Sequence, residues 1–316
     1  MNSLSNLKLR HLETFVEVAR QKSVSRAAEN LAVTQPAVTR TLRELERICG
    51  CALVEREGRG IRITQRGEMF LRHAAGSLAS ARAALNTIDQ LGADDGPAIR
   101  VGALPTVSAT RMPAAVNRYF VSGMRARLKI VSGDNHVLLD QLRNGELDFV
   151  MGRLPAPENM AGLVFEPFYR DRVVFVVHSH HELAGRDRIA AEDFDRFPVL
   201  LPPEGSIIQP FVDRLFIELG FARPRNVVET VSDSFGKAYL RRYPAIWIIS
   251  RGVVSGELDS GEFALLAIDT SSTLGSVGLV TRAGSELPAP ASFFAELLRG
   301  LTAEGEGAEG QNGRPV

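Results

Sequence analysis

The chain of 316 residues contains only two cysteines, Cys49 and Cys51, together with one tryptophan and four tyrosines. So few thiols exclude a small secreted domain held together by disulfides and favour a reducing compartment. No run of about 18 apolar residues occurs, which excludes an ordinary membrane-spanning helix. The first residues are amphipathic and lack the apolar segment and cleavage site of a secretory signal. We therefore expect a cytoplasmic protein.

Motifs of common enzyme classes are also missing. Gly236-Lys237 is followed by Ala238, so there is no Walker A loop, and neither Gly-x-Ser-x-Gly nor His-Glu-x-x-His occurs. The histidines between His178 and Glu182 could suggest a metal site, but an exposed loop after a strand is the more ordinary reading because no further ligand set completes the ligation. We expect no catalytic residue, no metal and no cofactor.

Charge is distributed unevenly although the net charge is zero. Residues 1–72 carry a net charge of +5 and the remainder a net charge of −5. A basic head on an acidic body is expected of a DNA-binding module joined to another domain, although chance clustering gives the same pattern.

The first 66 residues predict three short helices and a small hairpin. Apolar residues recur at spacings of three and four in the first helix, Ser23 or Ser25 can cap the second, and Thr34 caps the third, with Pro36 in its first turn. A hairpin with a glycine-rich tip follows. The predicted helices span about 9–19, 26–31 and 34–48, and the predicted strands 53–55 and 61–64.

These elements predict a winged helix-turn-helix whose third helix meets base edges in the major groove. Gln35 can hydrogen-bond adenine, Arg40 can bind guanine through two hydrogen bonds, and Arg43 is placed to meet a phosphate. Each arginine alone could be a solvated surface charge, so the prediction depends on their clustering. The candidate DNA-contacting residues are Ser25, Thr34, Gln35, Ala37, Thr39, Arg40, Arg43, Arg56, Arg59 and Arg62.

A long helix is predicted over residues 67–92. Its apolar residues follow alternating steps of three and four, as in a coiled coil: Leu71, Ala74, Leu78, Ala81, Leu85 and Ile88. Such a seam favours a dimer contact, and the alternative is packing against the next domain of the same chain.

From residue 93 to 301 short apolar runs alternate with helical stretches, which predicts an α/β domain with parallel sheets. The number of strands favours two lobes, lobe I at about 97–164 and 267–301 and lobe II at about 165–266. Residues 302–316 are rich in glycine and glutamate and predict a disordered tail. The candidate strands are 99–103, 127–131, 147–151, 173–177, 198–201, 245–249, 263–268 and 277–280.

Ligands of open parallel sheets bind beyond the carboxyl ends of the strands. The segments that follow these strands are rich in hydroxyl and helix-capping residues, and Arg153 adds a full positive charge. A small carboxylate would suit such a site, although Asp134 and Glu204 would repel it and several of these residues could be simple caps.

Two segments, LRHLETFVEVARQKSVSRAAENLAVTQPAVTRTLRELE and LVEREGRGIRITQRGEMFL, resemble the LysR-type transcriptional regulators, and the later domain order matches as well. Where the family commonly has Gly-x-x-Leu-Phe-x-Arg, this chain has valine at position 54 and keeps Arg56. The resemblance implies a winged helix-turn-helix that binds double-stranded DNA, a linker helix that pairs subunits, a homodimer or homotetramer, and a two-lobed effector domain like periplasmic binding proteins. It also implies pocket positions at Thr106, Ser108, Asp134, Asn135, Arg153, Pro202 and Ser206.

Several later stretches, among them those at 97–108, 206–210 and 229–236, resemble the subgroup that activates the pca operon for protocatechuate catabolism. The resemblance implies a ring-cleavage product, a small di- or tricarboxylate, as effector, with RNA polymerase as a possible partner. The alternatives are a LysR-type regulator with another effector, such as a sugar derivative, and a soluble small-molecule-binding protein. Cys49 and Cys51 could form a redox switch or be two ordinary small residues.

Overall fold

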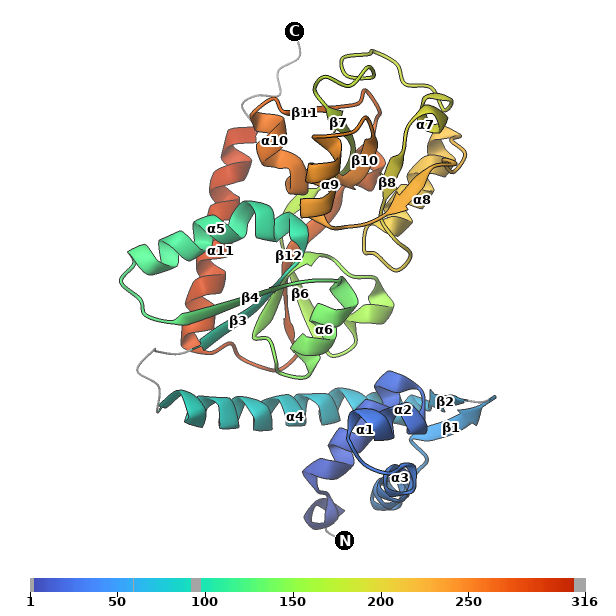
Figure 1. The fold of residues 1–316 in the computed structure, drawn as a ribbon. Helices are drawn as coiled ribbons and strands as arrows, with labels where there is room; N and C mark the ends of the chain where they lie inside the picture. Colours follow the sequence, from blue (N-terminus) through green and yellow to red (C-terminus); the bar gives the residue numbers. More distant parts are fainter. Residues whose placement is uncertain (1–2, 59, 92–97, 310–316) are drawn as a thin grey trace.

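The computed structural model describes residues 3–58, 60–91 and 98–309. A small N-terminal domain lies at one end of a long helix, α4 (Gln65–Leu91), and a two-lobed α/β domain lies along one side of this helix (Figure 1). The fold is thus an α/β protein with an N-terminal winged helix-turn-helix, a linker helix and a two-lobed domain, as the sequence predicts.

The N-terminal domain consists of η1 (Ser3–Asn6), α1 (Leu9–Gln21), α2 (Val24–Asn30), α3 (Gln35–Cys49), β1 (Val54–Glu57) and β2 (Gly60–Ile63). The hydroxyl of Ser23 accepts a hydrogen bond from the amide of Arg26, so Ser23 caps α2. Helix α3 ends at Cys49 and is capped by Gly50, whose φ of 68° is the left-handed conformation that glycine adopts without strain. Phe15, Leu45 and Leu53 join the three helices and the hairpin in one core.

The first half of the linker helix packs within this domain. Ala74 and Leu78 form a small buried cluster with Leu12 of α1. Leu85, farther along the same predicted seam, is 65% exposed. Only the later part of the seam is therefore open to a partner subunit, whereas Ala74 and Leu78 pack against the preceding N-terminal domain, which neither reading of the seam had predicted. Ile88 lies outside the residues whose side chains are described.

Lobe I is a five-stranded sheet covered by helices on both faces. Its strand order is β4-β3-β5-β12-β6, in which β4, β3 and β5 are parallel and β12 runs antiparallel to both of its neighbours. The elements are β3 (Ala98–Ala103), α5 (Pro105–Val121), β4 (Arg127–Ser132), α6 (Asn135–Arg143), β5 (Phe149–Arg153), η2 (Pro157–Met160), β6 (Leu163–Asp171), β12 (Gly275–Arg282) and α11 (Ala289–Glu309).

Lobe II is a second five-stranded sheet with the order β11-β7-β10-β8-β9, built around the buried Trp247 and Phe175. Strands β10, β8 and β9 are parallel, and β7 is antiparallel to β10 and β11. The elements are β7 (Val173–His178), α7 (Asp193–Arg196), β8 (Val199–Leu201), α8 (Gln209–Leu219), β9 (Val227–Glu229), α9 (Asp233–Leu240), β10 (Ile246–Ser250), η3 (Arg251–Val254), α10 (Ser255–Asp259), β11 (Phe263–Leu265) and η4 (Ser271–Thr273).

The sheets differ from the expected purely parallel ones. The chain passes from β6 to β7 and returns from β11 to β12 without a crossover helix, so these strands lie antiparallel to a neighbour in their sheets. The sequence reading also missed β6, because Pro167 interrupts it, and proline is tolerated there since β6 is an edge strand. The lobes consequently divide after Asp171 and not at 164.

Strand β9 is another element that the sequence reading missed, because it is a short, half-exposed edge strand. At the C-terminal end, helix α11 continues to Glu309, where a disordered tail was expected from residue 302. Alanine and glutamate between 303 and 309 favour helix enough to offset the glycines at 305 and 307. Residues 310–316 lie outside the described part of the chain.

Candidate DNA-binding surface and effector pocket

One face of α3 collects most of the predicted DNA contacts. Gln35, Arg40 and Arg43 are exposed, and together with Pro36 and the half-buried Thr39 they line a shallow hollow in the surface. The opposite face of α3 is buried through Val38, Leu42 and Leu45. Thr34 and Ala37 lie exposed in the first turn, where Thr34 occupies the N-cap position without a side-chain capping hydrogen bond. The first turns of α3 thus present an unobstructed polar face.

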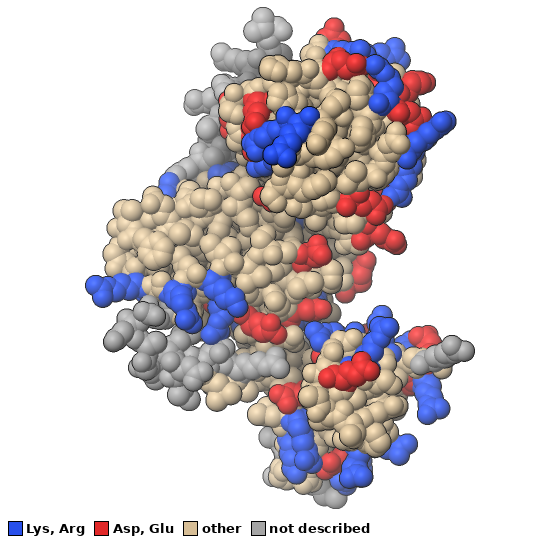
Figure 2. Space-filling view, viewed as in Figure 1, with Lys and Arg blue, Asp and Glu red and all other residues tan. Residues whose placement is uncertain are grey.

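Ser25 is also exposed, within the first turn of α2. Because Ser23 makes the capping hydrogen bond, the Ser25 hydroxyl is not needed to cap the helix. Figure 2 shows Lys and Arg side chains at the margins of the N-terminal domain, with acidic residues between them.

The hairpin presents fewer free cations than the sequence suggests. Arg62 makes ion pairs with Glu55 at 2.5 Å and with Glu57 at 3.5 Å. These pairs are well exposed, so they are weak, but they hold the guanidinium along the hairpin. Arg56 is exposed, and Arg59 lies outside the described residues.

A further residue, which the sequence reading did not single out, orients the hairpin. Oε1 of Glu46 on α3 accepts hydrogen bonds from the amides of Leu53 at 2.8 Å and Val54 at 3.2 Å. A carboxylate acceptor shared by two amides fixes the start of β1 relative to α3. Leu45-Glu46, at the end of the first segment that resembles LysR-type regulators, is the sequence signal that could have indicated this role.

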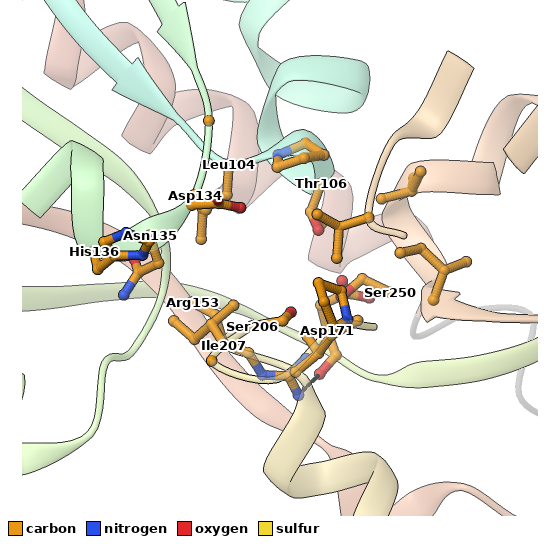
Figure 3. A pocket seen from close by; sticks show the side chains of 18 of the residues that line it. Leu104, Thr106, Asp134, Asn135, His136, Arg153, Asp171, Ser206, Ile207 and Ser250 are labelled. Carbon is orange, nitrogen blue, oxygen red and sulfur yellow. Dashed lines mark hydrogen bonds between the residues drawn. The ribbon is translucent and has the colours of Figure 1, made fainter. Parts of the chain in front are cut away.

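A pocket lies between the two lobes, with an empty volume of about 780 Å³ that includes its open mouth. Lobe I contributes the ends of β3, β4 and β5 with the first turns of α5 and α6, and lobe II contributes the loop before α8 and the end of β10 (Figure 3). This is the position expected of a ligand site at the carboxyl ends of parallel strands. The polar lining residues are Thr106, Asp134, Asn135, His136, Arg153, Asp171, Glu204, Ser206 and Ser250.

Two predicted pocket residues do not line it. Helix α5 begins at Pro105, so Thr106 faces the pocket, whereas Ser108 lies two residues farther on, on another side of the helix. The hydroxyl of Ser108 donates a hydrogen bond to the Ala103 carbonyl at 3.4 Å. Pro202 is buried at the end of β8, and the next residue, Pro203, lines the pocket instead.

Arg153 is the charged group that lies deepest, with 4% of its surface exposed. Its Nη2 donates hydrogen bonds to the carbonyls of Asp171, at 3.0 Å, and of Thr273, which lie on the two chain segments that join the lobes. The guanidinium also lies over the ring of Phe211 in lobe II, 4.3 Å from its centre. Among the described residues Nε and Nη1 have no hydrogen-bond partner. Burial lowers the pKa of Arg153, and the Asp171 charge opposes that shift.

Asp171 is the second buried ionisable group, 8% exposed, and the sequence reading missed it because it ends the unpredicted strand β6. Its Oδ1 accepts a hydrogen bond from the Arg172 amide at 2.9 Å, whereas its Oδ2 has no partner within the described chain. Burial raises the pKa of Asp171, and the Arg172 amide and the Arg153 charge work against that shift. Ser250 also escaped prediction, since no local pattern marks it, whereas His136 belongs to a segment that follows a predicted strand but was not singled out.

The electrostatics of the pocket favour an anion only in part. Helices α5 and α6 both begin at the pocket, so their amino-terminal N–H groups and Arg153 contribute positive potential. The carboxyl groups of Asp134 and Glu204 contribute negative potential at the same pocket. Carboxylate and hydroxyl groups of a ligand would both find partners here.

In the described part of the chain, the histidine and cysteine candidates form neither a metal site nor a reactive thiol. His181 is 7% exposed and packs against Phe197, and no group of three or more metal-ligating side chains occurs in the described ranges. Cys49 and Cys51 are free, and burial raises the pKa of the Cys49 thiol, which disfavours the reactive thiolate. Where the chain is described, no helix is long and apolar enough to cross a membrane.

Comparison with known proteins places both domains in one family. Residues 9–68 match the family model "Bacterial regulatory helix-turn-helix protein, lysR family", and residues 92–303 match "LysR substrate binding domain". The transcriptional regulator PcaQ of Agrobacterium fabrum is 48% identical over 94% of this chain and 96% of its own length. The regulator YdcI of Escherichia coli is 30% identical over 94% and 97%. A full-length OxyR variant from Pseudomonas aeruginosa shares the fold, with a TM-score of 0.55, 22% identity and coverage of 92% and 97%.

Proposed function

The chain belongs to the LysR family of bacterial transcription regulators, and from that premise we propose that it activates an operon of protocatechuate catabolism in response to a small carboxylate. The pathway comes from the relative PcaQ, which is 48% identical over nearly the whole chain. The class of ligand comes from the pocket between the lobes.

The single observation that supports a carboxylate is Arg153. A guanidinium that is 4% exposed, with Nη1 and Nε lacking protein partners, is costly to bury unless a ligand completes its hydrogen bonds. A β-carbon on Gly275 would lie 2.8 Å from both Nε and Nη2, so that edge of the guanidinium is packed against the chain. Nη1 is then the nitrogen left to donate to a carboxylate, supported by the helix N-termini of α5 and α6.

The DNA contacts are proposed on the exposed face of α3, with Gln35 and Arg40 at base edges and Arg43 at the backbone, and with Ser25 and Arg56 as flanking contacts. Arg62 also belongs to this set of DNA contacts, but it contributes less to the free energy of DNA binding because it is paired with Glu55 and Glu57.

The protein would act in the cytoplasm as a homodimer or homotetramer, with RNA polymerase as a partner on DNA, and without catalysing a reaction. The open part of the linker seam, which includes the exposed Leu85, suits a second subunit.

A second class of effector is favoured by one specific observation. Asp134 and Glu204 line the pocket together with Thr106 and Ser206, and carboxyl and hydroxyl groups of this kind bind the hydroxyls of sugar derivatives. Asp134 and Glu204 would repel the more highly charged tricarboxylates, so the two classes of effector are distinguishable by charge.

The experiment that tests the proposal is calorimetric titration of the full-length protein. The probes are β-carboxy-cis,cis-muconate, which ring cleavage of protocatechuate yields, its trimethyl ester, and gluconate. We expect the carboxylate to bind at least tenfold more tightly than the ester. Tighter binding of gluconate than of β-carboxy-cis,cis-muconate would instead support a sugar derivative as effector. If none of the three compounds binds, both classes of effector are contradicted.

A further inference from the structure

Helix α6 connects the effector pocket with the linker helix. Its N-cap residue Asp134 and its first residues, Asn135 and His136, line the pocket (Figure 3). Its other end is followed by Gly145, which lies against α4, and Figure 1 shows α6 directly over α4. Nine helical residues span about 14 Å, so one short helix covers the whole distance between the two sites.

The contact between Gly145 and α4 leaves no free space. A β-carbon on Gly145 would lie 2.9 Å from Cα of Ala79 and 3.1 Å from both its Cβ and its carbonyl oxygen. Gly145 also has a φ of 74°, a conformation that favours glycine. Ala79 is 1% exposed. Lobe I and the linker helix therefore meet backbone to backbone at this point.

The segment between the pocket and this contact is held firmly. Leu138, Leu139 and Leu142 of α6 are buried in one cluster with Leu104, which itself lines the pocket. Such close-packed side chains transmit displacement instead of absorbing it.

The turn around Gly145 is fixed by a second anchor. Nη1 of Arg282 donates hydrogen bonds to the carbonyls of Leu142 at 2.8 Å and Leu147 at 2.7 Å, one on each side of Gly145. Local bending of this turn would break these bonds, so a movement of α6 must displace Gly145 against Ala79.

The basic side chain of Arg20 in the DNA-binding head lies near the same end of α6. Arg20 of α1 makes an ion pair with Glu17 at 2.7 Å. The Glu17 hydrogen bond raises the pKa of Arg20, and the charges of Asp140 and Glu146 in lobe I add to that effect. Arg20 of the head therefore lies near enough to lobe I for the charges of Asp140 and Glu146 to act on it.

We propose that α6 carries the state of the effector pocket to the DNA-binding head, and that the contact of Gly145 with Ala79 is the point of transmission. The inference rests on the proposed function of the pocket as the effector site. Coupling of this kind is reciprocal in binding free energy: DNA must change the affinity of the pocket for its effector by the same factor as the effector changes the affinity for DNA. We therefore expect DNA bound at the head to alter the pocket end of α6.

The test is amide hydrogen exchange of the full-length protein, free and bound to a duplex that the protein itself selects from a random-sequence library. Ala79→Val adds two methyl groups where there is no room, and Ala84→Val, at an exposed position of the same helix, is the matched control with the same loss of helix propensity. In the free protein we expect exchange at residues 144–147 to rise at least threefold in Ala79→Val and to stay unchanged in Ala84→Val. Ala79→Ser adds only a single non-hydrogen atom, so the rise in exchange at residues 144–147 should be smaller. This variant replaces Ala79→Val in the test if the valine variant does not fold.

Binding of the duplex should change exchange at residues 134–138 at least twofold in the unaltered protein and in Ala84→Val. In Ala79→Val this change should disappear while the duplex still binds. A change of full size in Ala79→Val, or none in the unaltered protein, would overturn the inference. Neither duplex measurement uses an effector, so failure of β-carboxy-cis,cis-muconate to bind would count against the proposed ligand and not against the coupling.

Discussion

Replacement of Arg153 by methionine tests the ligand chemistry of the pocket most sharply. Methionine is unbranched, so it fills much of the same volume next to Phe211 and removes the charge and all five donors. One hydrogen bond from a charged donor contributes about 1.5–3 kcal/mol, so loss of the Nη1 contact predicts weaker carboxylate binding by roughly 10- to 150-fold. The effect should be nearly absent for the trimethyl ester, which carries no charge.

The same substitution has opposing effects on the stability of the fold. It leaves the carbonyls of Asp171 and Thr273 without the Nη2 donor, but it also removes a buried and only partly paired cation. We therefore expect a small net change in the free energy of unfolding, which thermal denaturation will measure. Calorimetric titration then compares Arg153→Met with Arg170→Met, an exposed arginine of the same lobe.

A second variant separates position from charge. Gly275→Ala keeps Arg153 but places a methyl group 2.8 Å from Nε and Nη2, so the guanidinium must shift. We expect an intermediate loss of carboxylate affinity. If folded Arg153→Met binds the carboxylate within twofold of the unaltered protein, the role assigned to Arg153 is refuted.

Three other predictions concern the DNA-binding domain and the pocket. Arg40→Ala should weaken binding to a selected duplex by about 1–3 kcal/mol and relax the preference at one base pair, whereas Arg62→Ala should have a smaller effect, as measured by fluorescence anisotropy. Glu46→Ala leaves two amides without their acceptor, so it should lower the free energy of unfolding by about 1–3 kcal/mol, as measured by urea denaturation. Glu13→Ala, at an exposed position of α1, is the control. A loss for Glu46→Ala as small as that for Glu13→Ala would count against the role of Glu46. Because burial raises the pKa of Asp171, its charged form disfavours folding at neutral pH, so Asp171→Asn should raise the melting temperature at pH 7, and the gain should shrink as the pH falls toward the unfolded pKa of 3.8. A gain that grows with acidity would contradict this assignment.

The parts of the molecule that follow local rules were predictable from the sequence. Helix α3 was located by its capping position at Thr34 and by Pro36, and Arg153 stood out as a charge at the end of a buried strand. The pocket position that the resemblance implied for Ser108 was wrong, because the face of a helix depends on its first residue, here Pro105. Ser108 lies two residues beyond Thr106, and that is enough to place its side chain outside the pocket.

Other features depend on contacts between distant segments and leave no local pattern. Asp171 becomes part of the pocket only because β6 pairs with β12 about a hundred residues later. The contact of Gly145 with Ala79 joins a loop of lobe I to the linker helix. An isolated glycine after a helix is an ordinary helix end in sequence, and only the tertiary arrangement shows what it packs against.

The central claim is that occupancy of the pocket beside Arg153 alters operator binding by the N-terminal domain. The most direct measurement is the dissociation constant for a selected duplex, by fluorescence anisotropy, with and without saturating β-carboxy-cis,cis-muconate. The account predicts a change of at least fivefold in the unaltered protein and none in Arg153→Met, in line with coupling free energies of about 1–3 kcal/mol. Equal dissociation constants with and without a carboxylate that calorimetry shows to be bound would contradict it.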